Sequence, residues 1–200
     1  MRIISYTDES DASAYPFLSA VVIPRPIAWI STCSAEGTGN LAPHSFFTVA
    51  CVEPPIVAFS SVGRKDTLRN IEEVREFVVN FSTVELMELI NASSAEFGPD
   101  IDEAAALGIA MEDSQAVQPR RVRDSPVAME CKVTSIQPLG DSTLVLGAVQ
   151  VIAVDDSVLD TKGRIDASAL QGVSRLARDQ WGMPPQPVTL QRPHLAGSQA

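Results

Sequence analysis

One segment, residues 25–70, limits the fold of this chain more than any other part of the sequence. It contains three short runs rich in β-forming residues, at 27–32, 46–51 and 56–60. A turn-like stretch with glycines follows the first run, and Pro54-Pro55 separates the other two. Glycine permits positive φ in turns, and proline cannot donate a strand hydrogen bond. Short strands joined this tightly predict hairpins of an antiparallel sheet.

The remaining strands continue the same architecture. Residues 77–81, 127–136 and 143–154 are predicted strands, and 127–136 alternates apolar with polar side chains. About six strands therefore dominate, with a few helices inserted between them. This spacing is typical of a mainly β chain that forms an antiparallel barrel, and it differs from alternating βαβ units.

Helices are predicted at three places in the middle of the chain. Residues 66–74 place apolar side chains at helical spacing, with Asp66 as the expected cap. Ser82 and Glu85 match a capping box ahead of a helix over 86–90, and 102–107 forms a third helix that Gly108 ends. Residues 167–181 are weakly helical, whereas 115–126 is expected to be an exposed connector.

Size and charge limit the classes of partner. The 200 residues, 45% of them hydrophobic, suit one domain over 1–200, with a core at about 15–160 and an extension at 161–200. The net charge of −10 disfavours nucleic acid and anionic membrane surfaces as partners. A small phosphorylated ligand needs only one or two local cations and remains compatible with this charge.

Cysteine and histidine usage bears on metals and on the cellular compartment. Three widely spaced cysteines, Cys33, Cys51 and Cys131, are typical of buried thiols in a reducing compartment. With two histidines and no zinc-binding motif, no metal site is expected. The chain also lacks the apolar core of a signal peptide and an apolar run of about 18 residues. A soluble cytoplasmic protein is expected.

A basic, hydroxylated stretch follows the third run. Lys65, Asp66 and Thr67 lie where a strand meets a helix start, just after Ser60 and Ser61. Free N–H groups and the helix dipole attract anions at such a junction. A phosphate site and a solvated turn with a capped helix are about equally consistent with this pattern.

A second candidate site is the segment 40–45, which surrounds a proline with small and polar residues. Small side chains let a planar ring approach the backbone, whereas the alternative is an ordinary hairpin shoulder. His44 is a weak catalytic candidate, because a lone histidine is more often structural. No catalytic residue is otherwise identified, since nucleotide-binding glycine motifs and a nucleophile elbow are both missing.

Three other features have competing interpretations. The polar residues 91–97 form either a plain loop or the wall of a site, including one in a neighbouring subunit. Arg25 could reach a ligand or a partner, and the arginines at 120–123 are expected to form a solvated face. Trp29 is expected in the core.

These segments together resemble the flavin reductase-like family of FMN-binding split barrels. The resemblance covers about residues 15–160 and includes the following segments in order: 25–32, 40–47, 54–57, 65–70, 91–97 and 125–131. It implies a mainly β fold, a Greek-key-like antiparallel split barrel with inserted helices. It also implies a homodimer with FMN near the subunit interface, and FAD as the alternative flavin.

The resemblance assigns cofactor contacts to particular positions. The isoalloxazine ring is expected against Asn40, Leu41, Ala42, Pro43, His44 and Ser45, with Ser31 and Thr32 close by. The ribityl chain and phosphate are expected at Ser60, Ser61, Lys65, Asp66 and Thr67. Residues 91–96 are expected to contribute across the dimer.

The implied activity is an NAD(P)H-dependent flavin reductase that supplies reduced flavin or electrons to an acceptor, such as a monooxygenase partner. Relatives often carry a glycine-rich element with a nearby tyrosine where this chain has residues 170–178. This departure leaves two alternatives open: a flavin carrier without reductase activity, and a reductase of ferric chelates or electron-carrier proteins. The choice between NADH and NADPH is also open.

Overall fold

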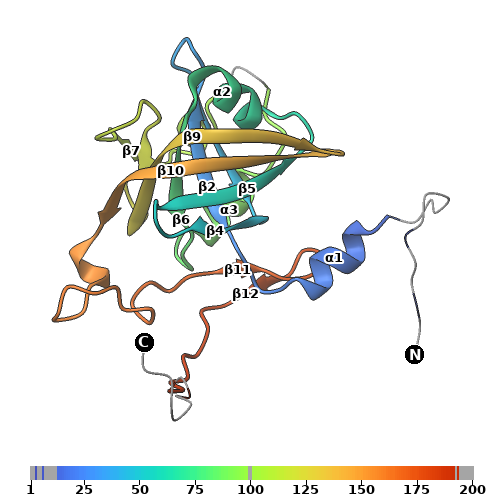
Figure 1. Cartoon of the computed structure of the whole chain (residues 1–200). Helices are drawn as coiled ribbons and strands as arrows, with labels where there is room; N and C mark the ends of the chain where they lie inside the picture. Colours follow the sequence, from blue (N-terminus) through green and yellow to red (C-terminus); the bar gives the residue numbers. More distant parts are fainter. Residues whose placement is uncertain (1–2, 4–5, 7–12, 99–100, 192, 194–200) are drawn as a thin grey trace.

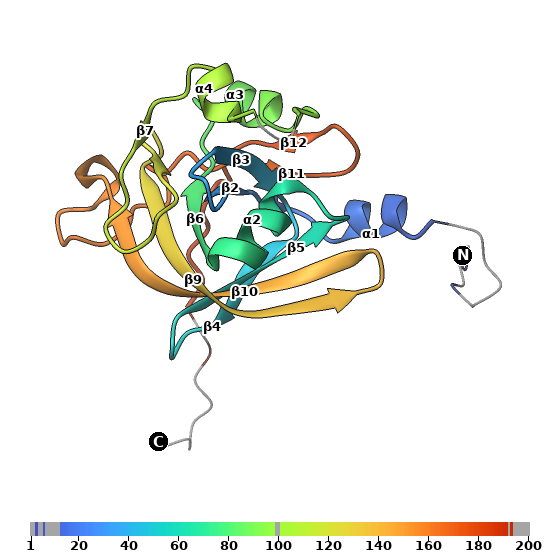
Figure 2. The same ribbon diagram turned by 90° about the horizontal axis from the view of Figure 1, so that it is seen from above.

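A seven-stranded antiparallel sheet forms most of the molecule. The computed structural model describes residues 3, 6, 13–98, 101–191 and 193. In sheet order the strands are β3 (Gly39–His44), β2 (Ala28–Cys33), β6 (Glu76–Phe81), β9 (Val127–Leu139), β10 (Ser142–Val154), β5 (Ile56–Val62) and β4 (Phe47–Cys51). Although β3 and β5 lie near opposite ends of this order, they are in contact. The sheet is therefore curled into a barrel, which Figures 1 and 2 show from two directions.

The barrel interior holds the main core. Phe59 of β5 packs edge-on against Phe77 of β6, with ring centroids 5.5 Å apart. Cys131 is fully buried, and Met129 and Val133 lie on the same side of β9. The alternation predicted for this strand is thus confirmed, because alternate residues of a strand point to opposite faces. Gly147 of β10 leaves room for Phe77, since a Cβ there would lie 2.4 Å from the ring.

A second apolar cluster lies outside the barrel. It joins β2 and β3 to the helices α3 (Met87–Ala92) and α4 (Glu103–Ala106). Trp29 is fully buried there, as expected, and its indole N–H donates to Ser93 Oγ at 2.9 Å. Every residue of β2 is buried, because one face of this strand contacts each cluster. That explains its continuous run of apolar and small residues.

Helix α2 (Asp66–Val74) has the predicted boundaries, but its predicted cap is wrong. Lys65 is the N-cap residue and makes no side-chain cap hydrogen bond. Asp66 is the first helical residue, and its carboxylate pairs with Arg69 at 2.9 Å. An ion pair three residues along the helix thus replaces the expected cap.

The predicted capping box at Ser82 and Glu85 is also wrong. Ser82 Oγ donates to the carbonyl oxygen of Ile27, and Thr83 forms a β-bridge with Gly172. The helix α3 begins only at Met87 and has no side-chain cap. The hydroxyl group that the local pattern assigns to the helix cap is thus used by a distant segment of the chain. By contrast, Asp102 caps α4 by accepting the N–H of Ala105.

Two expectations for the second half of the chain are wrong as well. Residues 167–181 contain no helix: β11 (Ser174–Arg175) and β12 (Trp181–Gly182) form a three-stranded sheet with β1 (Arg25–Pro26). Within 115–126, β8 (Arg121–Val122) pairs with β7 (Met111–Glu112), and Val122 is buried. Pairing between distant segments leaves little local signal in a sequence.

The arginines at 120–123 do not all belong to a solvated face. The Arg121 side chain is only 18% exposed and pairs with Glu112 at 2.7 Å. Its guanidinium also lies 3.7 Å from the fully buried Glu130, whose carboxylate accepts the N–H groups of Gln115 and Ala116. These bonds fasten the 115–126 segment to the barrel.

Helix α1 (Tyr15–Val21) projects to one side of the barrel (Figures 1 and 2). The buried Arg25 fixes the C-terminal end of α1, because the Arg25 guanidinium donates to the carbonyl oxygens of Ser19 and Val22. It also donates to the carbonyl oxygen of Leu176 at 2.7 Å. Among the described residues, no helix is long and apolar enough to cross a membrane.

Candidate functional site

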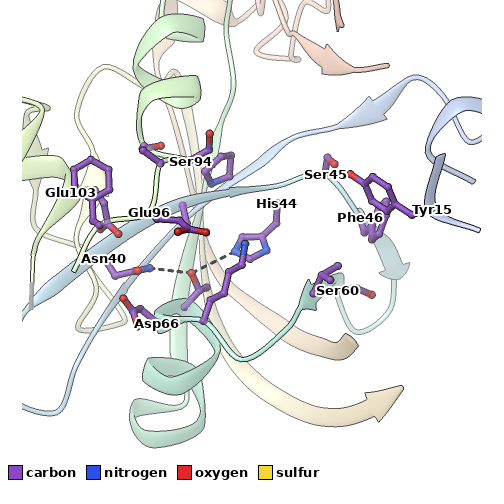
Figure 3. A pocket seen from close by; sticks show the side chains of 18 residues that line it. Tyr15, Asn40, His44, Ser45, Phe46, Ser60, Asp66, Ser94, Glu96 and Glu103 are labelled. Carbon is purple, nitrogen blue, oxygen red and sulfur yellow. Dashed lines mark hydrogen bonds between the residues drawn. The ribbon is translucent and has the colours of Figure 1, made fainter. Parts of the chain in front are cut away.

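A cavity of about 660 Å³ opens where β3, the β5–α2 junction and the segment after α3 meet. This volume lies within the range of small-molecule sites, roughly 300–1,000 Å³. Figure 3 shows Tyr15, Ser45 and Phe46 at one end of the cavity and Glu103 near the other. Most of the sequence-predicted residues line it: Asn40, Ala42, Pro43, His44, Ser45, Ser60, Lys65, Asp66 and Thr67.

Four predicted residues do not line this cavity. Ser61 is fully buried, and Leu41 belongs to the outer apolar cluster. Ser31 donates to the carbonyl oxygen of Arg120, and Thr32 Oγ1 accepts amide hydrogens from two asparagine side chains. Side chains alternate along a strand, so Ser61 and Leu41 point away from the face that their neighbours present. Ser31, Thr32 and Leu41 instead line a smaller cavity of about 270 Å³.

The amide of Asn40 is fixed by hydroxyl groups from two elements. Its Nδ2 lies 3.1 Å from Thr32 Oγ1 on β2 and 3.0 Å from Thr67 Oγ1 on α2. Both amide hydrogens are thereby used, as Figure 3 shows in part. The amide oxygen of Asn40 is then the atom that this side chain offers to a ligand.

His44 is held as a neutral ring. Its Nε2 lies 3.4 Å from Thr67 Oγ1, and its ring centroid is 4.9 Å from that of Phe59. Burial lowers the pKa of His44 to about 4, the charge of Lys65 adds to this effect, and the carbonyl of Ser60 opposes it. At neutral pH the ring therefore carries no proton to donate as a cation.

The N-terminus of α2 faces the cavity without a side-chain cap. Lys65 has extended backbone dihedrals and an exposed side chain, and Asp66 and Thr67 line the cavity beside it. The first N–H groups of a helix lack partners within the helix and carry a partial positive charge. Because Asp66 is paired with Arg69, its charge is partly offset. This end of the cavity is suited to an anion.

A buried carboxyl group that the sequence reasoning did not select also lines the cavity, on the same side as Asn40 and Asp66 (Figure 3). Glu103 of α4 is 6% exposed, and its Oε2 accepts the N–H of Leu41 at 2.8 Å. Burial raises the pKa of Glu103, while that hydrogen bond opposes the rise. Gly39 permits the close approach of α4, since a Cβ there would lie 2.5 Å from Asp102 Oδ2. In the sequence, Gly39 is the one residue that could have indicated this close contact between β3 and α4.

Other lining residues come from segments far apart in the sequence. Tyr15 of α1 and Phe46 lie with ring centroids 6.4 Å apart, and sequence reasoning missed both. Residues 93–97 of the same chain form a wall, so this segment contributes to the cavity within one subunit. Among the described residues, no group of three or more His, Cys, Asp or Glu side chains is placed to hold a metal ion.

Residues 19–169 match the family model of the flavin reductase like domain. The chain belongs to the flavin reductase-like family. The protein YwrF of Bacillus subtilis is 35% identical over 204 residues, covering 96% of this chain and all of YwrF. The prediction of a mainly β split barrel, made from the resemblance to this family, is confirmed.

Two solved structures are close to this flavin reductase-like chain. Nitrilotriacetate monooxygenase component B from Bacillus cereus superposes with a TM-score of 0.89 at 30% identity, covering 95% of this chain and 98% of that one. The 2-nitrobenzoate 2-nitroreductase NbaA of Pseudomonas fluorescens also has a TM-score of 0.89, at 28% identity and with coverages of 98% and 99%. Both similarities extend through the C-terminal segment as well as the barrel.

Proposed function

We propose that this chain is an FMN-binding oxidoreductase that uses NAD(P)H to reduce flavin and passes the electrons to an acceptor. The observation that carries the proposal is the pairing of two features in one cavity. An uncapped helix N-terminus with Lys65 lies on one wall, and β3 presents small residues on another. A phosphorylated planar ligand is matched by both.

The residues present fit a flavin mononucleotide. The phosphate would be held by Lys65, the hydroxyl of Thr67 and the first N–H groups of α2. Ala42 and Pro43 would let the ring approach β3, and the amide oxygen of Asn40 would accept from a ring or ribityl donor. When bound, the flavin supplies the capacity to accept and release a hydride or electrons. FAD is the alternative flavin.

The protein's own contribution is binding, orientation and electrostatics. His44 is neutral and keeps the Thr67 hydroxyl in place, so it is not required as a proton donor. Glu103 holds β3 through the N–H of Leu41. Lys65 and the N-terminus of α2 keep a positive potential on the anion side of the cavity. Each of these groups would act in binding and orientation, without a covalent bond to the ligand.

The proposed electron acceptor is a partner monooxygenase. A monooxygenase component at 30% identity over nearly the whole chain supports transfer of reduced flavin to a partner monooxygenase. The competing function is a flavin carrier without reductase activity. It is favoured by one observation, namely that residues 170–178 lack the glycine-rich element and instead form part of a sheet with β1.

Anaerobic addition of NADH or NADPH to the FMN-loaded protein tests the proposal. Rapid bleaching of the visible flavin band is expected with at least one nucleotide, and free FMN at the same concentration is the control. A stable yellow complex that neither nucleotide bleaches would favour the carrier. Failure to bind FMN or FAD at all would contradict both functions.

A further inference from the structure

A second cavity, of about 470 Å³, adjoins the one already described. The two share wall residues, namely Tyr15, Pro43, Ser45 and Ser94. The C-terminal segment contributes three further wall residues, Arg175, Asp179 and Trp181. The C-terminal segment therefore forms a wall next to the proposed flavin site.

Two arginines line the second cavity, although the chain as a whole carries a net charge of −10. Arg25 is engaged by the main-chain carbonyl oxygens of Ser19, Val22 and Leu176. It is also 5% exposed, so its donors are directed into the protein. Arg25 is thus a structural clasp between α1 and the C-terminal segment.

Arg175 has a different environment. Its guanidinium lies 5.1 Å from the centroid of the Trp181 ring and donates once, to the carbonyl oxygen of Arg178 at 2.7 Å. In the part of the chain that the structure describes, it forms no ion pair with a carboxylate. Asp179, the acidic residue of this cavity, is exposed and does not pair with it. A half-buried, oriented guanidinium with unused donors is suited to a carboxylate or phosphate.

We propose that this second cavity is a subsite for the anionic group of an organic substrate that reacts in the adjoining cavity, with Arg175 as its counter-ion. The inference rests on the proposed function, because that function requires a substrate beside the flavin. Ile27, Pro43 and Ile90 form apolar parts of the wall, so the ligand has an apolar body next to its anionic group. A carboxylated aromatic compound and the diphosphate of a nucleotide both have this chemistry.

Trp181 provides a local probe of binding. The chain has two tryptophans, and Trp29 is fully buried in the outer cluster with its N–H bonded to Ser93. Quenching of tryptophan fluorescence by a ligand that enters this cavity therefore reports on Trp181, and Trp181→Phe should remove the signal. The probes are two matched pairs: benzoate with neutral benzamide, and ADP with neutral adenosine.

The purified protein is titrated with each probe, without and with saturating FMN. Benzoate or ADP should bind at least about tenfold more tightly than its neutral counterpart, because a charge-assisted hydrogen bond contributes this much. Arg175→Gln should abolish that preference. Arg178→Gln removes the same charge from an exposed position of the same turn outside the cavity, and should preserve it. The pair that shows the preference distinguishes a carboxylate from a diphosphate ligand.

Three results would overturn the subsite: no anion preference in the wild type, an undiminished preference in Arg175→Gln, or an equal loss in Arg178→Gln. If Arg175→Gln does not fold, protection of Arg175 from phenylglyoxal in the wild type replaces it. Bound benzoate or ADP should slow the modification at this residue, mapped by mass spectrometry, and an unchanged rate would refute the proposal. Flavin absorbance titrations on the same samples separate the two proposals, since an anion preference without FMN binding refutes the proposed function alone.

Discussion

His44 shows how one residue can be important for the site and yet be unsuited to acid catalysis. The sequence offers a lone histidine between a proline and a serine. In the folded chain its ring packs on Phe59 and reaches Thr67, while Lys65 adds a repulsive charge. Burial of a titratable group disfavours its charged form. The buried environment therefore keeps the His44 ring neutral at pH 7, so it has no cationic proton to donate.

The pH dependence of stability tests this account of His44. Its pKa is about 4 in the native protein, against an ordinary value of 6.5. The unfolded chain binds a proton in this window while the native chain does not, so the free energy of unfolding falls as the pH drops below about 6.5. The contribution of His44 to this fall should be about 2 kcal/mol between pH 7 and pH 5.

Urea denaturation of the wild type and His44→Gln at both pH values isolates this term. The variant lacks the titrating ring, so its free energy of unfolding should decrease by about 2 kcal/mol less over the interval. Glu103, whose raised pKa acts in the opposite direction, is present in both proteins and cancels in the comparison. Identical pH slopes for the two proteins would show that His44 is not buried as a neutral ring.

At the scale of elements, the sequence predicted those that depend on short-range patterns and missed those that depend on pairing between distant segments. The boundaries of α2 agree with the apolar spacing of Leu68, Ile71 and Val74, and β9 has the predicted alternation. The segment 167–181 was misread because β11 and β12 depend on pairing with β1, about 150 residues earlier. Likewise, no strand is predicted from the sequence at residues 39–44, although β3 pairs with β2 along its whole length.

The prediction at the scale of elements concerns phosphate binding at the N-terminus of α2. If the helix start and Lys65 hold the phosphate of FMN, Lys65→Ala should weaken FMN binding about 10- to 100-fold, or about 1–3 kcal/mol. Quenching of flavin fluorescence during titration measures the affinity. Lys162→Ala removes the same charge from an exposed loop and should bind FMN like the wild type. Equal affinities for both variants would mean that the phosphate lies elsewhere.

At the scale of the whole molecule, α1 exposes an apolar surface to solvent. Phe17, Leu18 and Val21 of α1 are 47%, 55% and 72% exposed, and the helix projects from the barrel (Figure 1). Contiguous exposed apolar side chains often mark protein interfaces. This surface supports the homodimer expected for the family, which we retain as a proposal.

Size-exclusion chromatography with light scattering tests the dimer. The wild type should elute with twice the mass of one chain, whereas Leu18→Glu should shift it toward the monomer, because an unpaired charge in an interface is costly. Leu139→Glu is the matched control, since Leu139 lies at the tip of the β9–β10 hairpin and is 53% exposed. A monomeric wild type, or the same shift in both variants, would contradict a dimer formed through α1.

By itself, the sequence determined the class of fold, the positions of α2, β9 and β10, and half of the residues that line the main cavity. These depend on side-chain periodicity and turn chemistry, which act between neighbours along the chain. Only the tertiary structure decided that Ser61 and Leu41 face away, that Glu103 and Tyr15 approach the cavity, and that Arg175 lines a second one. These positions depend on strand direction and on pairing between distant segments, and no local sequence pattern predicts either one.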